Sequence, residues 1–252
     1  MKMNRFQAFG WHLLGSACIA LLSAGLVFLV WYPGALAAAV GVEQIFLLVL
    51  AVDVVIGPVI TLIVFNPRKI KLRRDLAIVV ALQIAALLYG LNTVMVARPV
   101  YMVFNVDRFD LVYANDLPQD KLDKVQRREF SSIPLFGPQI IAARRPDDPQ
   151  ERKKILFSAL DGGDDLPQLP QYYVPYQDMH AEVAKHMYPL EKLRALNRSA
   201  SVAVDSLLEK YAQVAGGVGY LPLKGKAKDK DMAVVIDRQS ARVLEIVNLK
   251  PW

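Results

Sequence analysis

The chain has 252 residues, 54% of them hydrophobic, and a formal net charge of +6. Residues 1–97 hold three long apolar runs and a charge of +4, whereas residues 98–252 have the composition of a soluble domain and a charge of +2. A charge of +2 is too small to indicate a nucleic-acid-binding protein, and the single cysteine, Cys18, excludes an intrachain disulfide and a thiolate metal cluster.

The three apolar runs are each long enough to form a membrane-spanning helix. They cover about residues 11–31, 45–65 and 76–97, and a helix needs roughly 20 residues to cross about 30 Å of hydrocarbon. The first run resembles a signal peptide because it follows two cations and precedes a small-residue stretch at 35–39. Its apolar core, Leu13 to Val30, exceeds the usual 7–15 residues of a signal peptide, so we expect a retained helix.

The short loop between the second and third runs, residues 66–75, is strongly basic, whereas the loop at 33–44 has no Lys or Arg. Short loops rich in Lys and Arg stay in the cytoplasm. We therefore expect the N-terminus and the basic loop inside and residues 98–252 outside. In a Gram-negative bacterium this is a multi-pass inner-membrane protein with a periplasmic domain. The topology-determining cations are Arg68, Lys69, Lys71, Arg73 and Arg74.

The polar and small residues of the spans follow helical spacing. Asp53, Gly57 and Thr61 lie at i, i+4 and i+8 and share one helix face, beside a kink expected at Pro58. A second face in the third run holds Gln83, Ala86, Gly90 and Thr93. Small residues let helix backbones approach closely in lipid. The spacing predicts a compact three-helix unit with room for a fourth helix from another chain.

Asp53 lies near mid-membrane, where a charge costs about 2.5–3.5 kcal/mol on insertion scales. Gln83 and Tyr89, on the antiparallel third helix, bracket it in depth and are able to hydrogen-bond it. Three interpretations stay open: a polar clasp within the chain, contact with a partner's membrane helix, and proton or ion translocation. The last needs an intramembrane relay beyond this one acid.

The sequence pattern of residues 98–252 predicts an α+β domain with antiparallel strands at both of its ends. We expect a hairpin over 98–113 with a turn near Asp107, followed by helices and then by two or three C-terminal strands. The helices are expected over 118–130, over 148–160, and in a zone at 177–211 that is broken at Pro189 and Asn197.

Metal-binding patterns in this domain are weak. His180 and His186 are six residues apart and so lie on different helix faces, and the acidic turn at 161–165 lacks the alternating ligands of a calcium loop. We expect an extended loop at 166–176 and an exposed hairpin connection at 224–231, with docking to a partner as the alternative for each.

Five short motifs, in this order along the chain, resemble one known family. They are Asp53-x-x-x-Gly57-Pro58-x-x-Thr61, Lys71-Leu72-x-x-Asp75-Leu76, Gln83-x-x-Ala86-Leu87-x-Tyr89-Gly90, Arg98-Pro99-Val100 and Pro251-Trp252. The set is similar to the TfpX/TfpZ family of type IV pilin accessory proteins, to which the fimbrial protein FimB is related. The likeness covers the membrane half and the two ends of the soluble half.

The resemblance implies a chaperone-like inner-membrane protein that binds and stabilises a type IV pilin and promotes pilus assembly. Its partners would be the pilin's membrane helix, its periplasmic head, and other inner-membrane assembly components. No enzymatic activity, cofactor, metal or catalytic residue is expected. The expected packing and pilin-contact residues are Asp53, Gly57, Pro58, Thr61, Gln83, Tyr89 and Gly90.

Different classes of function stay open beside this one. The chain could be a membrane-anchored periplasmic sensor or a pilin-modifying enzyme, and an enzyme should show a pocket where titratable residues converge. A small transporter subunit would need the intramembrane relay named above. A pilin gene beside this gene would favour the accessory protein.

Overall fold

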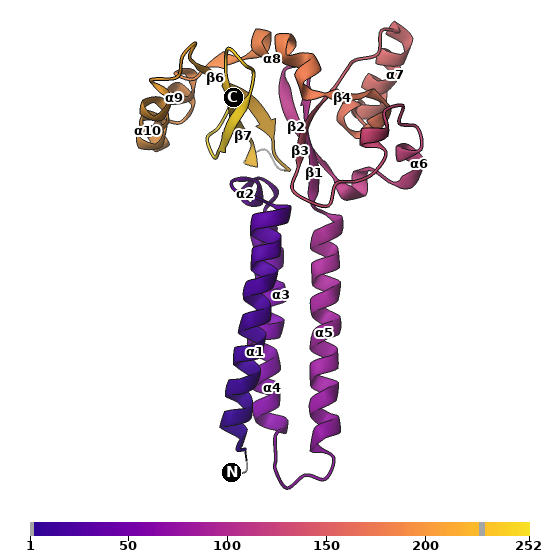
Figure 1. The fold of residues 1–252 in the computed structure, drawn as a ribbon, viewed down its shortest axis with the longest axis vertical. Coiled ribbons are helices and arrows are strands. Elements are labelled where there is room, and N and C mark those ends of the chain that lie inside the picture. Colours follow the sequence, from indigo (N-terminus) through magenta and orange to yellow (C-terminus); the bar gives the residue numbers. More distant parts are fainter. Residues whose placement is uncertain (1–2, 227–229) are drawn as a thin grey trace. The chain divides into compact units, whose positions relative to one another are not determined.

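The computed structural model describes residues 3–226 and 230–252, and the chain divides into two compact units (Figure 1). The helical unit comprises residues 1–30 and 41–97; the other unit, here called the outer domain because the sequence predicts it outside the cytoplasm, comprises residues 31–40 and 98–252. The sequence predicts one boundary, after residue 97. In the structure the segment 31–40 also packs with the outer domain, so the chain passes between the units three times.

Within the described residues, three helical stretches of the chain are long and apolar enough to cross a membrane: Arg5–Trp31, Val42–Val64 and Leu72–Val96. Their elements are α1 (Arg5–Gly25) continued by a π-helical segment Leu26–Trp31, α3 (Val42–Leu50), a π-helical segment Ala51–Ile56, α4 (Gly57–Val64) and α5 (Leu72–Val96). A capping box fixes the start of α1, because the backbone N–H of Gln7 donates to the Asn4 side chain and the reverse bond also forms, each at 2.9 Å.

The helical unit packs through small residues and leaves its large apolar side chains outward. The buried residues of α1 are Ala8, Ser16 and Ser23, whereas Leu29 and Ile63 stay more than three-quarters exposed. This distribution suits helices surrounded by lipid, where association relies on close backbone packing. α1 packs chiefly against α4, and α5 packs against α3 and α4, so the middle stretch lies between the other two.

The outer domain is built on a mixed sheet, which has eight strands in the part of the chain that the structure describes. The order is β4-β3-β1-β2-β6-β7-β8, and β5 pairs with β6. The strands are β1 (Pro99–Asn105), β2 (Arg108–Tyr113), β3 (Gln139–Ala143), β4 (Tyr173–Pro175), β5 (Tyr188–Pro189), β6 (Val218–Lys224), β7 (Met232–Asp237) and β8 (Val243–Val247).

The predicted strand orientation is only partly right. The β1–β2 hairpin and the β6–β7–β8 meander are antiparallel as expected, but β3 runs parallel beside β1 and β6 runs parallel beside β2. Strands joined by a tight turn pair antiparallel, whereas parallel neighbours need a long connection. β3 and β6 reach the central hairpin through such connections, which local sequence patterns do not reveal.

The helices of the outer domain are α2 (Leu36–Val40), α6 (Gln119–Leu122), α7 (Pro149–Leu160), α8 (His180–His186), α9 (Lys192–Leu196) and α10 (Ser201–Tyr211). The helix predicted over 148–160 is confirmed as α7, which begins after its N-cap Asp148. The one predicted over 118–130 is mostly wrong, since α6 covers four residues and a 3₁₀ turn follows at Arg128–Phe130. In the zone 177–211, helix breaks occur at Pro189 and Asn197 as predicted.

The segment 31–40 forms part of the outer domain's core. Leu36 and Ala39 are buried in the cluster that holds Phe104, Phe109 and Leu223 of the sheet. The carbonyl of Ala39 also accepts a hydrogen bond from the backbone N–H of Lys226 at 3.4 Å. The loop before the second apolar run is therefore a structural element of the outer domain.

Candidate functional site

Asp53 is the central residue of the 23-residue helical stretch Val42–Val64 and is only 6% exposed. It lies in the π-helical segment that ends where α4 begins, and the Gly57 N–H donates to the carbonyl of Val52, five residues earlier. Pro58, which has no N–H, follows at once in the first turn of α4. The three residues of the predicted face, Asp53, Gly57 and Thr61, are all buried. Short π-helical segments occur often at functional sites.

Gly57 lets α4 and α5 approach closely. A Cβ placed on Gly57 would lie 1.7 Å from Nε2 of Gln83, so the space beside this glycine is filled by the Gln83 amide. The same Nε2 donates to the backbone carbonyl of Asp53 at 3.1 Å. Gln83 therefore hydrogen-bonds Asp53 as predicted, but through the main-chain carbonyl of Asp53 and not through its carboxylate.

His12 joins the site from α1. Its Nδ1 lies 2.6 Å from Oγ1 of Thr61 and links α1 to α4. The spacing of polar residues predicts that Thr61 shares one face with Asp53, but it names no partner for the hydroxyl on another helix. Sequence reasoning misses His12 itself, although this residue lies one helical turn before the buried Ser16 of α1.

A cavity of about 200 Å³, here called the membrane cavity, opens between α1 and α5 at the depth of Asp53. Its lining residues are Trp11, His12, Gly15, Ser16 and Ile19 of α1, Asp53 of the middle stretch, and Val80, Gln83, Ile84 and Leu87 of α5. In the described part of the chain, both carboxylate oxygens of Asp53 and Oε1 of Gln83 are buried and have no hydrogen-bond partner. The membrane cavity therefore presents acceptors that no described residue of this chain satisfies.

Of the other predicted site residues, Gly90 packs between helices and Tyr89 does not reach the site. Gly90 is a packing residue, because a Cβ there would lie 2.6 Å from Cγ2 of Val49 on α3. Tyr89 is 76% exposed and does not line the membrane cavity, so the structure does not bring it to Asp53. The cations of the loop 66–75 are exposed, and Lys69 pairs with Asp75 at 2.5 Å.

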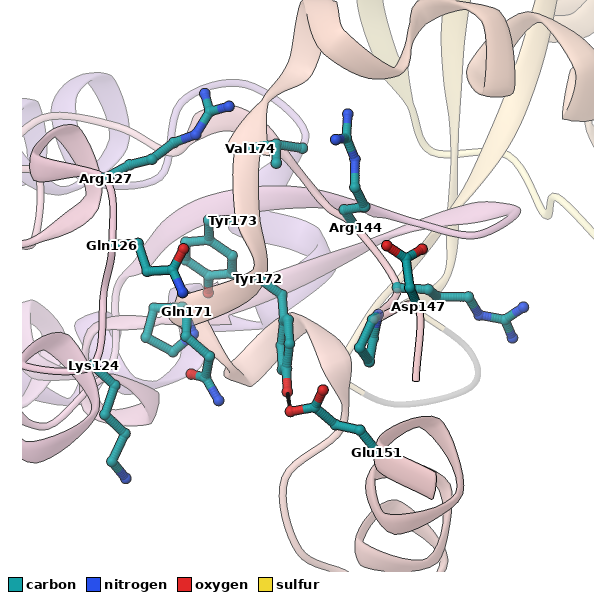
Figure 2. A pocket seen from close by; sticks show the side chains of 13 residues that line it. Lys124, Gln126, Arg127, Arg144, Asp147, Glu151, Gln171, Tyr172, Tyr173 and Val174 are labelled. Atoms are coloured by element: carbon teal, nitrogen blue, oxygen red, sulfur yellow. Dashed lines mark hydrogen bonds between the residues drawn. The ribbon is translucent and has the colours of Figure 1, made fainter. Parts of the chain in front are cut away.

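The outer domain has a separate hollow of about 590 Å³, here called the basic cavity (Figure 2). Its cations are Lys124, Arg127, Arg144 and Arg145, and its acids are Asp147 and Glu151. Glu151 accepts a hydrogen bond from the Tyr172 hydroxyl, and burial together with this carboxylate raises the pKa of Tyr172 to about 12. Arg144 and Arg145 form no ion pair within the described residues, so the cavity carries uncompensated positive charge.

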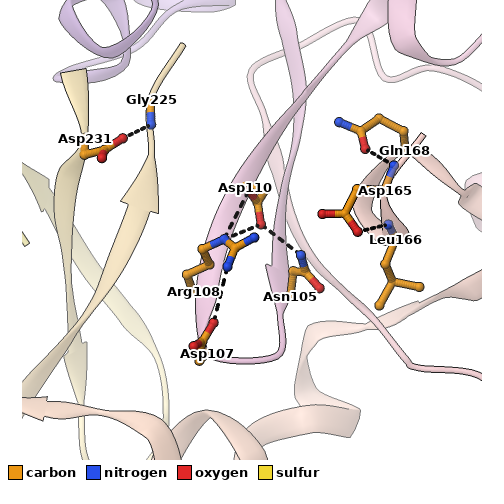
Figure 3. Close-up of polar contacts among 9 residues, drawn as sticks. All are labelled: Asn105, Asp107, Arg108, Asp110, Asp165, Leu166, Gln168, Gly225 and Asp231. Atoms are coloured by element: carbon orange, nitrogen blue, oxygen red, sulfur yellow. Dashed lines mark hydrogen bonds and ion pairs between the residues drawn. The ribbon is translucent and has the colours of Figure 1, made fainter. Parts of the chain in front are cut away.

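A buried acid lies near the turn of the β1–β2 hairpin (Figure 3). Asp110 of β2 accepts from the Asn105 amide at 3.1 Å and pairs with Arg108 at 3.2 Å. Burial raises the pKa of Asp110 above its ordinary value, and Arg108 opposes this shift only in part. A second acid, Asp237, behaves in the opposite way: hydrogen bonds from Ser240 and Gln239 lower its pKa.

These two acids predict opposite pH effects on stability. Because folding raises the pKa of Asp110, its contribution is full below the unfolded pKa of about 3.9 and is lost as pH rises through the folded pKa. We expect Asp110→Asn to gain stability relative to wild type as the pH rises from about 4 to about 7, because the amide has no charge to desolvate. Asp237→Asn is the control: folding lowers the pKa of Asp237, so its contribution is lost only as pH falls below about 3.9, and the stability of this variant relative to wild type should stay nearly constant from about pH 4 to about 7. Thermal unfolding in detergent measures both, and parallel curves for the two variants would contradict the assignment.

Within the described ranges, no group of three or more His, Cys, Asp or Glu side chains could hold a metal ion. The His180 ring meets the Tyr176 ring edge-on, and His186 contacts the carbonyl of Glu182, so the two histidines have separate partners. The acidic turn at 161–165 ends α7, and Asp164 pairs with Lys121 at 2.6 Å. The loop 166–176 contains two 3₁₀ turns and β4, and the predicted connection at 224–231 falls partly on residues 227–229, outside the described residues.

Three helical stretches long and apolar enough to span a membrane, joined to a mixed α+β domain, are the architecture of a membrane protein. Residues 2–41 match the family model of the fimbrial assembly protein FimB. Over 233 residues the chain is 31% identical to the fimbrial assembly protein of serogroup I from Dichelobacter nodosus, which covers 91% of this chain and 89% of that protein.

Two more relatives from Dichelobacter nodosus match. The fimbrial assembly protein of serogroup E1 is 31% identical over the same shares of both chains, and that of serogroups C1 and C2 is 36% identical over 116 residues, 45% of this chain and 88% of that protein. No solved structure matches. The chain belongs to the FimB family of fimbrial assembly proteins, which confirms the resemblance drawn from the motifs.

Proposed function

We propose that this protein is an inner-membrane assembly factor that binds a type IV pilin and keeps it stable until the pilus takes it up. The membrane cavity carries this proposal: α1 and α5 leave a space at the middle of the span, and the buried carboxylate at its base lacks a donor among the described residues. A pilin waiting in the same bilayer offers one apolar helix and a head outside the membrane. The two units of this protein would bind one part each.

The proposed orientation places the N-terminus and the basic loop in the cytoplasm. Arg68, Lys71 and Arg73 of this loop are exposed and form no ion pair in the described part of the chain, and this supports a loop held on the cytoplasmic side. The outer domain then lies in the periplasm, on the side where pilin heads are found.

Deletion of the gene tests the proposed function. Surface pili and total cellular pilin are measured separately, and we expect both to fall, because unprotected pilin is degraded. Unchanged amounts of both would contradict the proposal. The intact mass of residual pilin distinguishes the alternative: an assembly factor leaves this mass unchanged, whereas a pilin-modifying enzyme would alter it.

We propose the basic cavity as the contact for the pilin head, through an acidic segment of that head. Arg144→Glu with Arg145→Glu should weaken pilin co-purification about tenfold, the effect of about 1.4 kcal/mol, since the uncompensated charge of the cavity is reversed. Lys185→Glu with Arg198→Glu makes the same change of charge at exposed positions outside the cavity and should retain pilin. Equal retention by both double variants would exclude this contact.

A further inference from the structure

The membrane cavity has an imbalance of hydrogen-bonding groups. Oδ1 and Oδ2 of Asp53 and Oε1 of Gln83 are acceptors, all buried, and none meets a donor within the described residues. The imidazole of His12 lines the same cavity but is engaged with Thr61. A polar group without a partner is costly in hydrocarbon, where no water is present to satisfy it. The site is therefore incomplete in the isolated chain.

We propose that the membrane cavity receives one transmembrane helix of a partner protein, which places a hydrogen-bond donor against Asp53 and Gln83. Lipid acyl chains also fit an apolar cavity, but they carry no donor. A second copy of this chain is disfavoured on the same ground, because a symmetric contact would set the acceptors of one cavity against those of the other.

The dimensions of the cavity agree with this occupant. A helix is about 10–12 Å across with its side chains, so it lies over the opening and inserts side chains into the 200 Å³ space. On the α1 side the cavity is lined by the small residues Gly15 and Ser16, and small residues allow the backbones of two helices to approach closely. Ile84 and Leu87 of α5 supply the opposite, apolar wall.

This proposal rests on the proposed function in one respect only: the proposed function says that the natural partner is a pilin. It requires a donor at the depth of Asp53 and no particular pilin sequence. Model helices therefore test it without pilin, and its failure is distinguishable from a failure of the pilus role, which gene deletion tests.

The experiment uses the full-length protein in phosphatidylcholine vesicles with a photo-cross-linking side chain at position 84 or at position 82. Ile84 lines the membrane cavity, whereas Leu82 is on the same helix, is 66% exposed and does not line it. The probes are two synthetic leucine–alanine helices of about 20 residues, identical except for a central glutamine or leucine.

At position 84 we expect the glutamine helix to give about three- to tenfold more adduct than the leucine helix, as one interhelical hydrogen bond in a membrane provides. Asp53→Leu should remove this difference, and Asp53→Asn, which keeps one acceptor oxygen, should retain most of it. At position 82 the glutamine helix and the leucine helix should give equal amounts of adduct. Equal adducts from the two helices at position 84 in wild type, or adducts mainly between two copies of the protein, would overturn the proposal. An unchanged preference in Asp53→Leu would do the same.

Discussion

Cells that carry Ile84→Trp as their only form of this protein should lose most of their surface pili. Ile84 forms part of the α5 wall of the membrane cavity, and the larger indole fills the space in which the proposed helix inserts. A loss of about 1.4 kcal/mol in binding already lowers occupancy tenfold, so we expect surface pili to fall by about tenfold. Immunoblots of sheared pili and of whole cells measure surface and total pilin.

Leu82→Trp is the matched control, since it adds the same indole to an exposed position of the same helix. It should leave both quantities near their wild-type values. The amount of each variant in the membrane is measured in parallel, so that a loss of the protein itself is recognised. Equal piliation in the two variants, at equal protein amounts, would contradict a role for the membrane cavity in assembly.

Gly90→Ala should destabilise the helical unit, although alanine favours a helix by about 0.5–1 kcal/mol over glycine. The new Cβ would lie 2.6 and 2.9 Å from the two Cγ atoms of Val49, whose branched side chain has little rotamer freedom. Overpacking of this kind costs about 1–3 kcal/mol. Unfolding in mixed detergent micelles measures the difference in the free energy of unfolding.

Two further variants separate the steric effect from helix propensity. Gly10→Ala has nothing within 4 Å of its new Cβ and should be neutral or slightly stabilising. Val49→Ala combined with Gly90→Ala should recover part of the loss, because the clashing methyl groups are gone. If Gly90→Ala behaves like Gly10→Ala, the close approach of α3 and α5 at this position is wrong.

The sequence predicts the helical unit well because hydrophobic length and polar spacing act within a single helix. Burial of Asp53, Gly57 and Thr61 on one face follows directly from their i, i+4, i+8 spacing. Partners on other helices are harder to predict, since they depend on rotation and tilt. For this reason the spacing does not predict that the Thr61 hydroxyl meets His12 of α1.

In the outer domain too, contacts between segments that are distant in the sequence could not be predicted. The turn of the β1–β2 hairpin is local and therefore predictable, but the parallel neighbours of this hairpin come from residues 139–143 and 218–224. The packing of segment 31–40 against the sheet is equally hidden, because its alanines and leucine read as part of a membrane-flanking loop. Pairings between distant segments leave no periodic signal in the chain.

Photo-cross-linking in living piliated cells tests the pilin assignment most directly. A photo-reactive side chain is placed at position 84 in one strain and at position 82 in another, and adducts are identified with antibody against pilin. We predict a pilin adduct from position 84 that is absent from position 82 and is lost when Asp53→Leu is added. Absence of pilin from the adducts of position 84, or equal pilin adducts at both positions, would contradict the binding of a pilin helix in the membrane cavity.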